Sequence, residues 1–321
     1  MSAAPRAVAV AAGLLQRADG RWLLAQRPVG KADAGLWEFP GGKLKPGESA
    51  DRALGRELHE ELGISIEGSE ALAIVTPTYA QRGLRLHGRV IRHWRGDPAA
   101  HEHQALRWVE TRELIRYPMP RPDWPLRARI ALSPQYAITP EPDACASFAA
   151  ELRATLARPG LGMISLRMRR ADAEALQRQA EIFLSVVRAE RPEVWTLLHG
   201  DPAEAKALGF DGVHLSSAAL REQTGRPPAA LWVLASVHNG AELMAAAQLG
   251  VDAAVLAPVA ATATHPGAPG LGWKRFARLA RGGAMPIYAL GGVRPEQLAE
   301  AQAHGAFGIA AIRGYWAARV R

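Results

Sequence analysis

The sequence predicts an α/β protein with two units in tandem, the first organised around one acidic helix and the second built as a small parallel barrel. The chain has 321 residues, more than one domain usually holds. A glycine-bounded segment rich in glutamate lies in the first half, and from residue 133 short apolar runs alternate with helical stretches. We therefore expect one domain over residues 1–132 and a second over residues 133–321.

The first unit opens with segments that resemble strands. Residues 7–15 form an apolar run that only Arg6 precedes and no cleavage-like sequence follows, which predicts a first strand rather than a secretion signal. Residues 22–26 predict a second strand, and residues 28–35 predict a loop. Such a loop can cover a bound ligand.

A helix is predicted between the turn at Pro46 and Gly47 and the glycine at Gly63. Ser49 can cap its N-terminus, and Gly63 can end it in a left-handed conformation. An apolar stripe at helical spacing predicts the buried face, and it consists of Leu54, Leu58 and Leu62.

Three glutamates lie next to that stripe. At about 100° per residue, Glu57, Glu60 and Glu61 fall within roughly a 100° arc of the helix. Like charges at this spacing destabilise a bare helix by roughly 0.2–0.5 kcal/mol per pair, so the cluster needs a compensating cation. Oxygen ligands favour Mg²⁺, or alternatively Mn²⁺, over zinc, and Mg²⁺ usually combines carboxylates with substrate phosphates. The sequence therefore predicts a divalent metal site that acts on a phosphate ester.

The segment GGKLKPGESADRALGRELHEELGI, which ends at Ile64, resembles the Nudix hydrolase signature at every defined position. Residues 7–132 are similar to the MutT branch of that family, which hydrolyses 8-oxo-dGTP to the monophosphate and pyrophosphate and so prevents mutation. The matching positions are Arg27, Phe39-Pro40-Gly41-Gly42, Glu102 before Trp108, and Tyr117-Pro118-Met119-Pro120 before Asp123 and Pro125. The resemblance implies a Nudix α/β/α sandwich and a nucleoside triphosphate substrate.

The resemblance also implies a metal site. Its ligands to Mg²⁺ would be the Gly41 carbonyl and the carboxylates of Glu57, Glu60, Glu61 and Glu102. Glu102, from a separate loop, would be a further ligand or a proton acceptor, and Arg56 would orient Glu57. Glu57, Glu60, Arg56 and Glu102 would then be the catalytic residues. The metal would neutralise charge on the phosphate oxygens while an activated water attacks phosphorus.

Substrate-binding residues follow from the same resemblance. They would be Arg27, Phe39, Gly42 and Asp123. MutT enzymes usually carry asparagine where this chain has Asp123. An ionised aspartate only accepts hydrogen bonds, so it suits a guanine N1/N2 edge, or an 8-oxo-purine if protonated. An ordinary loop aspartate is the alternative, and the nucleobase preference stays open. His101 and His103 flank Glu102, but their spacing alone is weak evidence for zinc, and surface histidines are expected.

Charge and cysteine content limit the remaining classes of function. The net charge of +8 divides into +5 for residues 1–133 (20 basic, 15 acidic) and +3 for the rest (19 basic, 16 acidic). Neither half is a strongly basic nucleic-acid module. Apolar residues alternate with the arginines at positions 82, 85, 89, 92 and 95, which favours a half-exposed strand face or attraction of a polyphosphate. We expect no direct DNA binding and no membrane partner. The single cysteine, Cys145, excludes an internal disulfide and fits a cytoplasmic protein.

The second unit shows eight apolar runs. They cover residues 136–139, 163–167, 196–199, 212–214, 231–236, 253–256, 286–289 and 308–312. Helical stretches such as 171–189, 241–248 and 295–304 separate them, which predicts a small (β/α)8 TIM barrel. Loops after the strands would hold any site, and Gly291, Gly292 and Gly314 are candidates to cradle a phosphate.

Residues 134–316 resemble the thiamin phosphate synthase and TenI family. The similarity lies in YAIT, DGVHLSS, SVHN, THPGAPGLGW, YALGGV and GAFGIAAIRG. This chain departs from the synthase, because His199-Gly200 replaces an Asn-Asp pair, Ala219 replaces a second metal-binding aspartate, and Arg313 replaces a serine near the phosphate. The resemblance to TenI, a thiazole tautomerase relative, implies that His238 could act as a general acid or base. A barrel that only binds a ligand, or serves as a scaffold, is the alternative.

Three functional hypotheses follow. The first is a MutT-type pyrophosphohydrolase in which the activity of the barrel stays open. The second is a bifunctional enzyme that also acts on thiamin precursors, with a phosphorylated small molecule bound at the barrel. The third is a module that senses nucleotides without hydrolysis. The intact set of glutamates, Glu57, Glu60, Glu61 and Glu102, favours the first hypothesis.

Overall fold

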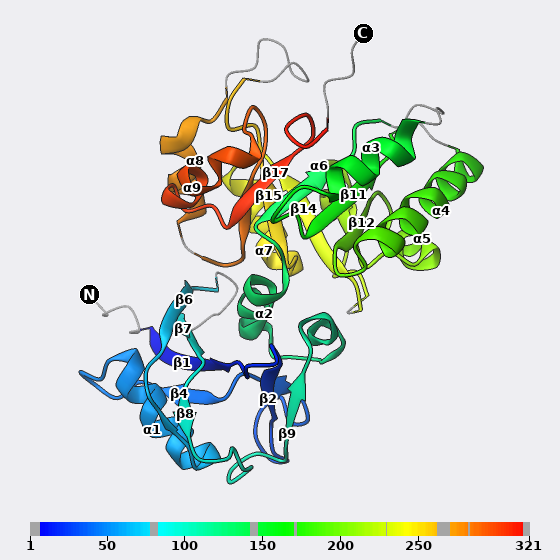
Figure 1. Cartoon of the computed structure of the whole chain (residues 1–321). Helices are drawn as coiled ribbons and strands as arrows, with labels where there is room; N and C mark the ends of the chain where they lie inside the picture. The colour runs from blue at the N-terminus through cyan, green and yellow to red at the C-terminus, as the bar shows by residue number, and fades with distance from the viewer. Residues whose placement is uncertain are drawn as a thin grey trace. The chain divides into compact units, whose positions relative to one another are not determined.

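The computed structural model describes residues 7–77, 83–141, 147–169, 172–228, 230–261, 270–281 and 283–316. Arg82, Cys145 and residues 264–269 of the predicted motifs lie outside this part of the chain. Two compact units are present: Met1–Ala131 with Gly282–Met285, and Leu132–Arg281 with Pro286–Arg321. Figure 1 shows the strands and helices of each unit along the chain.

The first unit contains a mixed four-stranded sheet of order β4-β1-β7-β6, a three-stranded sheet of order β3-β2-β9, and the short pair β5-β8. The strands are β1 (Val8–Leu15), β2 (Trp22–Gln26), β3 (Trp37–Glu38), β4 (Gly41–Lys43), β5 (Ser65–Ile66), β6 (Glu70–Val75), β7 (Leu84–Ile91), β8 (Trp94–Arg95) and β9 (Ala105–Val109). The strands predicted at residues 7–15 and 22–26 are confirmed as β1 and β2. Residues 28–35 form turns without strand or helix, as predicted.

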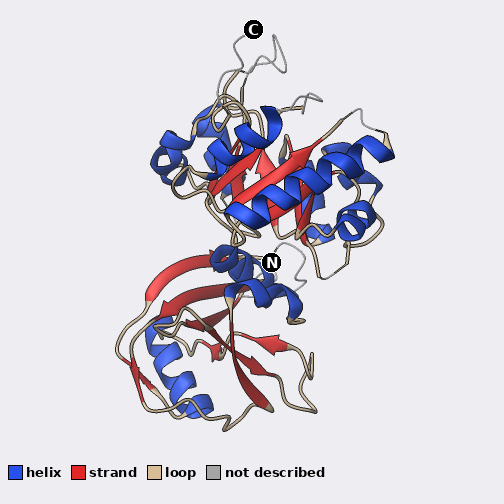
Figure 2. Ribbon diagram, turned by 45° about the vertical axis from the view of Figure 1, so that its right-hand side comes forward, coloured by secondary structure: helices blue, strands red, loops and turns tan. Residues whose placement is uncertain are grey.

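Two helices, α1 (Ala50–Leu62) and α2 (Trp124–Ala131), cover opposite faces of the larger sheet. A Cβ atom added to Gly13 of β1 would lie 3.2 Å from Leu54 of α1, whereas one added to Gly88 of β7 would lie 2.4 Å from Leu126 of α2. Gly88 is the register partner of Ala12, and neighbouring residues of a strand point to opposite faces. The unit is therefore an α/β/α sandwich, as the resemblance implies. Figure 2 shows its helices and strands by class.

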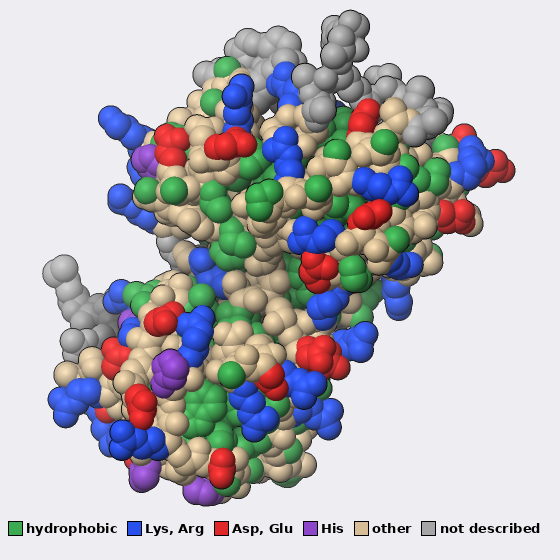
Figure 3. All heavy atoms as spheres, in the orientation of Figure 1, with side chains coloured by type: hydrophobic (Ala, Val, Ile, Leu, Met, Phe, Trp, Pro, Cys, Tyr) green, Lys and Arg blue, Asp and Glu red, His purple; other side chains and the backbone are tan. Residues whose placement is uncertain are grey.

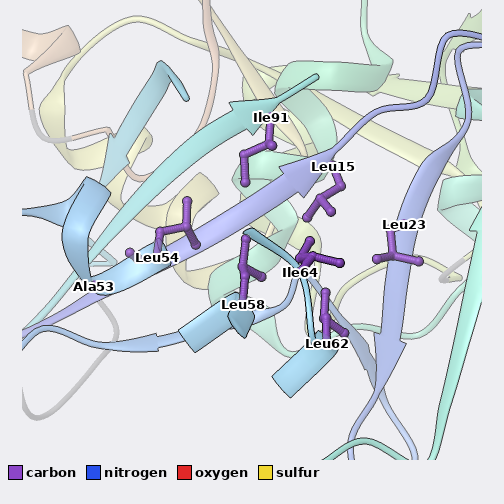
Figure 4. Packing of buried hydrophobic residues seen from close by; sticks show 9 residues of the cluster. Leu15, Leu23, Ala53, Leu54, Leu58, Leu62, Ile64 and Ile91 are labelled. Carbon is purple, nitrogen blue, oxygen red and sulfur yellow. The ribbon is translucent and has the colours of Figure 1, made fainter. Parts of the chain in front are cut away.

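Helix α1 has the predicted caps and the predicted buried face. The Ser49 side chain accepts a hydrogen bond from the Arg52 backbone N–H, and Gly63 ends the helix with a φ of 70°. The leucine stripe packs into a core cluster that comprises Ala11, Leu15, Leu23, Ala53, Leu54, Leu58, Leu62, Ile64 and Ile91 (Figure 4). Burying a leucine contributes roughly 1.5–3 kcal/mol, so this stripe fixes how the helix is rotated. That rotation decides where the glutamates lie.

The second unit is a closed barrel of eight parallel strands that pair in chain order. Figures 1 and 2 show helices around these strands. Its strands are β10 (Gln135–Ile138), β11 (Met163–Arg167), β12 (Trp195–His199), β13 (Gly212–Leu215), β14 (Trp232–Val237), β15 (Ala253–Leu256), β16 (Ile287–Ala289) and β17 (Gly308–Ala311). Each predicted run matches one of them to within one residue at either end, so the predicted barrel is confirmed.

Helices follow the strands around the barrel. They are α3 (Ser147–Leu156), α4 (Ala173–Glu190), α5 (Pro202–Leu208), α6 (Ser217–Glu222), α7 (Gly240–Leu249), α8 (Gly272–Ala280) and α9 (Leu298–Ala303). The helical stretches predicted at 171–189 and 241–248 correspond to α4 and α7, and the stretch at 295–304 is a 3-10 turn (Pro295–Gln297) that continues into α9. Within the described residues, no helix combines the length and the apolar character that crossing a bilayer requires.

Candidate functional site

The acidic face of α1 packs closely against two glycines at the start of β4. The Gly41 backbone N–H donates a hydrogen bond of 3.0 Å to Oε2 of Glu61. The Glu57 carboxylate occupies the space in front of Gly42, where an added Cβ would lie 2.2 Å from its Cδ. Gly41 itself has a φ of 145° and no room for a side chain beside the Ala11 carbonyl. Both glycines are therefore needed for the carboxylates to reach this backbone.

One guanidinium serves several carboxylates on this face. Arg56 Nη1 lies 2.7 Å from Oε1 of Glu57 and 3.5 Å from Oε2 of Glu60, and Nη2 lies 3.1 Å from Oε2 of Glu48. Hydrogen bonds from Arg56 and from the Lys45 backbone lower the pKa of Glu48 to about 2, and the contacts with Glu48 and Glu57 raise the pKa of Arg56. The carboxylates outnumber this one cation, so the face keeps a negative charge.

The donor set fits a hard divalent cation. Glu57 and Glu61 have mostly buried side chains, Glu60 is half exposed, and all three lie on one side of α1 with the Gly41 backbone beside them. Carboxylate and carbonyl oxygens are the ligands that Mg²⁺ prefers. Among the residues that the structure describes, no three His, Cys, Asp or Glu side chains are already grouped to hold a metal ion. Arg56 and the Gly41 N–H engage the carboxylates instead.

The loop before β9 places its predicted residues differently. Oε2 of Glu102 pairs with Nζ of Lys31 at 3.6 Å and is half exposed, so the structure does not bring Glu102 to the carboxylates of α1. His101 is exposed, as expected. The expectation of a surface histidine is wrong for His103, whose side chain is only 4% exposed, with Nε2 3.3 Å from Oε2 of Glu61. The side chain is buried because its loop folds over the end of α1.

A second group of side chains surrounds the residues predicted to bind the nucleoside. Phe39 is 4% exposed and Asp123 is 7% exposed. The guanidinium of Arg27 forms an ion pair with Glu38 and also donates to the Ala32 carbonyl. Sequence reasoning missed Glu38, although it is the only charged residue in the stretch LWEFPGG.

Burial controls the charge of both acids in this group. It raises the pKa of Asp123 well above its usual range, and the neighbouring Glu38 raises that pKa further. Burial also raises the pKa of Glu38, despite the opposing effect of Arg27. Asp123 is therefore biased towards its neutral form, in which a carboxyl group both donates and accepts a hydrogen bond.

The predicted arginine cluster is largely paired with acidic side chains. Arg89 lies 2.7 Å from Asp51, and Arg92 lies 2.6 Å from Glu70. Arg95 likewise contacts Glu67 at 2.8 Å. Figure 3 shows basic and acidic side chains intermixed on the visible face. These contacts favour the interpretation as a solvated strand face over a nucleic-acid groove.

His238 and the two glycines predicted at the barrel mouth follow their strands. His238 comes directly after β14, and its Nδ1 lies 3.0 Å from Oε2 of Glu242, whose other oxygen lies 3.0 Å from Arg221. Gly291 and Gly292 come after β16, with φ values of 93° and 69°. An added Cβ on Gly292 would lie 2.7 Å from that of Ala260, so only glycine fits there.

A buried polar chain among the barrel strands was not identified from the sequence. The Tyr136 hydroxyl lies 2.8 Å from Nδ1 of His214, whose Nε2 lies 2.9 Å from the Ser236 hydroxyl. His199 stacks on His214 with ring centroids 4.5 Å apart. Alternating polar residues within apolar strand runs were the only sequence signal.

Burial keeps these imidazoles neutral. It lowers the pKa of His199 to about 4, with Arg167 adding to the effect, and lowers the pKa of His214 well below its usual range. Arg167 is 9% exposed, and no acidic partner pairs with it among the described residues. Burial lowers the pKa of Arg167 too. This mouth suits an anion better than a divalent cation.

Comparison with known proteins assigns the two units separately. A family model described as NUDIX domain matches residues 11–129, and one described as Thiamine monophosphate synthase matches residues 135–315. The CTP pyrophosphohydrolase of Escherichia coli (strain K12) is 44% identical over 119 residues, which are 37% of this chain and 87% of that protein. The 8-oxo-dGTP diphosphatase of Haemophilus influenzae is 36% identical over 107 residues, 33% of this chain and 79% of that protein. The thiamine-phosphate synthase of Methanoregula boonei is 36% identical over 111 residues, 34% of this chain and 51% of that protein.

Proposed function

The chain belongs to the Nudix family through its first unit and to the thiamine monophosphate synthase family through its second, and on this premise we propose that it is a Mg²⁺-dependent nucleoside triphosphate pyrophosphohydrolase. The products would be the nucleoside monophosphate and pyrophosphate. The observation that carries the proposal is the packing of the α1 carboxylates against Gly41 and Gly42, with Arg56 between Glu57 and Glu60.

The residues of the proposed site have different roles. Glu57, Glu60, Glu61 and the Gly41 carbonyl would hold Mg²⁺, which supplies charge neutralisation at the phosphate oxygens when bound. Arg56 keeps the Glu57 carboxylate in place against Gly42. Glu102 would accept a proton or add a ligand after leaving Lys31, because its loop brings it to the same end of the unit as Glu61.

The preferred substrate in this proposal is 8-oxo-dGTP, which makes the enzyme one that removes a mutagenic nucleotide. Asp123, where MutT enzymes usually carry asparagine, is compatible with this substrate. A neutral aspartic acid presents one donor and one acceptor, as the amide of asparagine does, and burial favours that neutral form. Phe39 would pack beside the base, and Arg27 would reach it by leaving Glu38.

CTP is the second candidate substrate. The paired acids Glu38 and Asp123 favour it, because a neutral carboxyl can donate to cytosine N3 while it accepts from the N4 amino group. The relative that is 44% identical is named for that substrate. A panel of canonical and oxidised nucleoside triphosphates, assayed with Mg²⁺ for pyrophosphate release, distinguishes the two. Higher kcat/KM for CTP than for 8-oxo-dGTP would overturn the preferred assignment.

The metal site is tested by Glu57→Gln in the full chain. Loss of one charged ligand should lower pyrophosphate release by more than about 100-fold, beyond the effect of changing an outer partner of a metal site. Glu70→Gln is the matched control, since Glu70, on β6, is an exposed carboxylate that pairs with Arg92. Full activity in Glu57→Gln would reject the assignment of α1 as the catalytic centre.

For the barrel we propose binding of a phosphorylated small molecule at the loops after β16 and β14. Gly291 and Gly292 supply backbone without side chains, and His238 is held by Glu242. If the barrel turns over thiazole phosphates, His238→Ala should abolish that reaction. Binding without turnover would leave the barrel as a ligand-binding unit, and absence of binding would reject the proposal.

A further inference from the structure

We propose that His103 is a positioning residue for the site on α1, where its imidazole holds the Glu61 carboxylate against the Gly41 N–H. One carboxylate oxygen of Glu61, Oε1, then stays available to the metal. This inference rests on the proposed function of α1 as a metal site. It adds a residue that the signature of α1 does not contain.

The buried side chain of His103 lies beside Glu61, and Glu38 is also close enough to interact with it electrostatically. Its side chain is 4% exposed, and Nε2 lies 3.3 Å from Oε2 of Glu61. Neither ring nitrogen has a hydrogen-bond partner within the described part of the chain. Leaving a buried polar group unpaired costs roughly 1–3 kcal/mol, so a small ring rotation that gives Nε2–H to Glu61 is favourable.

Backbone contacts place the loop without help from the imidazole. The Ala99 N–H donates to the Leu62 carbonyl at 3.0 Å, and the His101 N–H donates to the Glu61 carbonyl at 3.1 Å. At its other end, the Gln104 N–H donates to the Gln26 carbonyl at 3.0 Å. A change of the His103 side chain should therefore leave the loop and the helix in place.

Glu61 is a sensitive point of the site. Its Oε2 accepts from Gly41, whose carbonyl is itself a predicted ligand, so a rotation of Glu61 would disturb two ligands together. Partners outside the ligand set commonly fix ligand orientation, and replacing them costs about 10–100-fold in metal affinity or activity. His103 has the burial and the distance from Glu61 that such a partner requires.

The test measures Mn²⁺ binding to the full chain, without nucleotide, by electron paramagnetic resonance. His103→Leu fills a similar space without a donor and should weaken Mn²⁺ binding by about 10–100-fold. His103→Gln keeps an N–H donor and should restore most of the affinity, while the exposed neighbour variant His101→Ala should bind as wild type does. Circular dichroism melting should give similar Tm values for all variants.

The possible outcomes separate this inference from the function on which it rests. Wild-type affinity in His103→Leu, or equal loss in His103→Leu and His103→Gln, would overturn the positioning role. If Glu57→Gln loses Mn²⁺ in the same assay while His103→Leu does not, only the role of His103 is wrong. If Glu57→Gln also binds as wild type does, α1 is not the metal site and the proposed function fails.

Discussion

The acidic face of α1 and the mouth of the barrel handle charge in opposite ways. Beside α1, hydrogen bonds from Arg56 and the Lys45 backbone lower the pKa of Glu48 to about 2. In the barrel, burial lowers the pKa of His199 to about 4 and leaves Arg167 without an ion-pair partner among the described residues. This contrast supports the proposals of a cation site on α1 and of an anion site in the barrel.

The difference follows from how each site is built. The glutamates of α1 lie on a helix face whose rotation is fixed by leucines, which places Glu57 and Glu60 beside Arg56 and Glu61 beside the Gly41 N–H. The imidazoles of His199 and His214 lie among the parallel strands of the barrel, where burial makes the charged imidazolium costly. By the resemblance to the synthase, His199-Gly200 and Ala219 would replace metal-binding acids in this chain.

Removal of divalent metal is the largest effect expected from this comparison. Chelation with EDTA should lower pyrophosphate release by at least about 100-fold, because a catalytic metal supplies several kcal/mol of charge stabilisation. Binding of phosphate at the barrel should not change with EDTA. Isothermal titration calorimetry with inorganic phosphate measures it. If EDTA weakens both pyrophosphate release and phosphate binding, the prediction that only the site on α1 depends on a divalent metal is wrong.

At low pH, protonation of His199 should destabilise the barrel. Its folded pKa of about 4 lies below the ordinary value of 6.5, so the unfolded chain binds the proton more readily between these values. Its contribution to stability is complete above pH 6.5 and is lost as the pH falls towards 4, by about 3 kcal/mol. Hydrogen exchange of the β12 and β13 peptides, measured at pH 7 and pH 4 after correction for intrinsic rates, reports that loss.

His199→Asn sharpens this result, because asparagine does not titrate. The variant should lose less protection than wild type between pH 7 and pH 4. His304→Asn is a control on the outer helices, since this side chain stacks on Trp273 rather than on His214. An identical acid response in wild type and His199→Asn would show that this imidazole is not the group that burial keeps neutral.

The two sites also differ in how far the sequence predicted them. The leucines of α1 recur at helical spacing between recognisable caps, and the barrel strands are short apolar runs separated by helical stretches, so local pattern was sufficient for both. The signature likewise predicted that Arg56 would lie beside Glu57, and the two side chains are in contact. These features depend on residues that are close in the chain.

The remaining site residues depend on contacts between distant segments. His103 is buried only because its loop folds over the end of α1, so nothing in its sequence neighbourhood predicted burial. Glu38 pairs with Arg27 across neighbouring strands, and this ion pair occupies the arginine expected to contact the nucleoside. Glu102 lies beside Lys31 rather than beside the acids of α1. Tertiary packing, which the sequence pattern does not contain, decided each of these positions.

The smallest expected effect concerns Asp123, where the first unit uses burial as the barrel does. Burial raises the folded pKa of Asp123 above its unfolded value, so its contribution to stability is complete below the unfolded pKa and is lost as the pH rises through the folded pKa. Asp123→Asn cannot ionise and keeps one donor and one acceptor. At pH 5 it should differ from wild type by less than about 1 kcal/mol, the size of one hydrogen bond. Thermal melting at pH 5 and pH 9 should show the variant gaining stability relative to wild type as the pH rises. If the variant instead loses stability relative to wild type as the pH rises, Asp123 is ionised in the folded protein. The Asp123 side chain would then only accept hydrogen bonds. Such a pocket favours the amino groups of an unoxidised base.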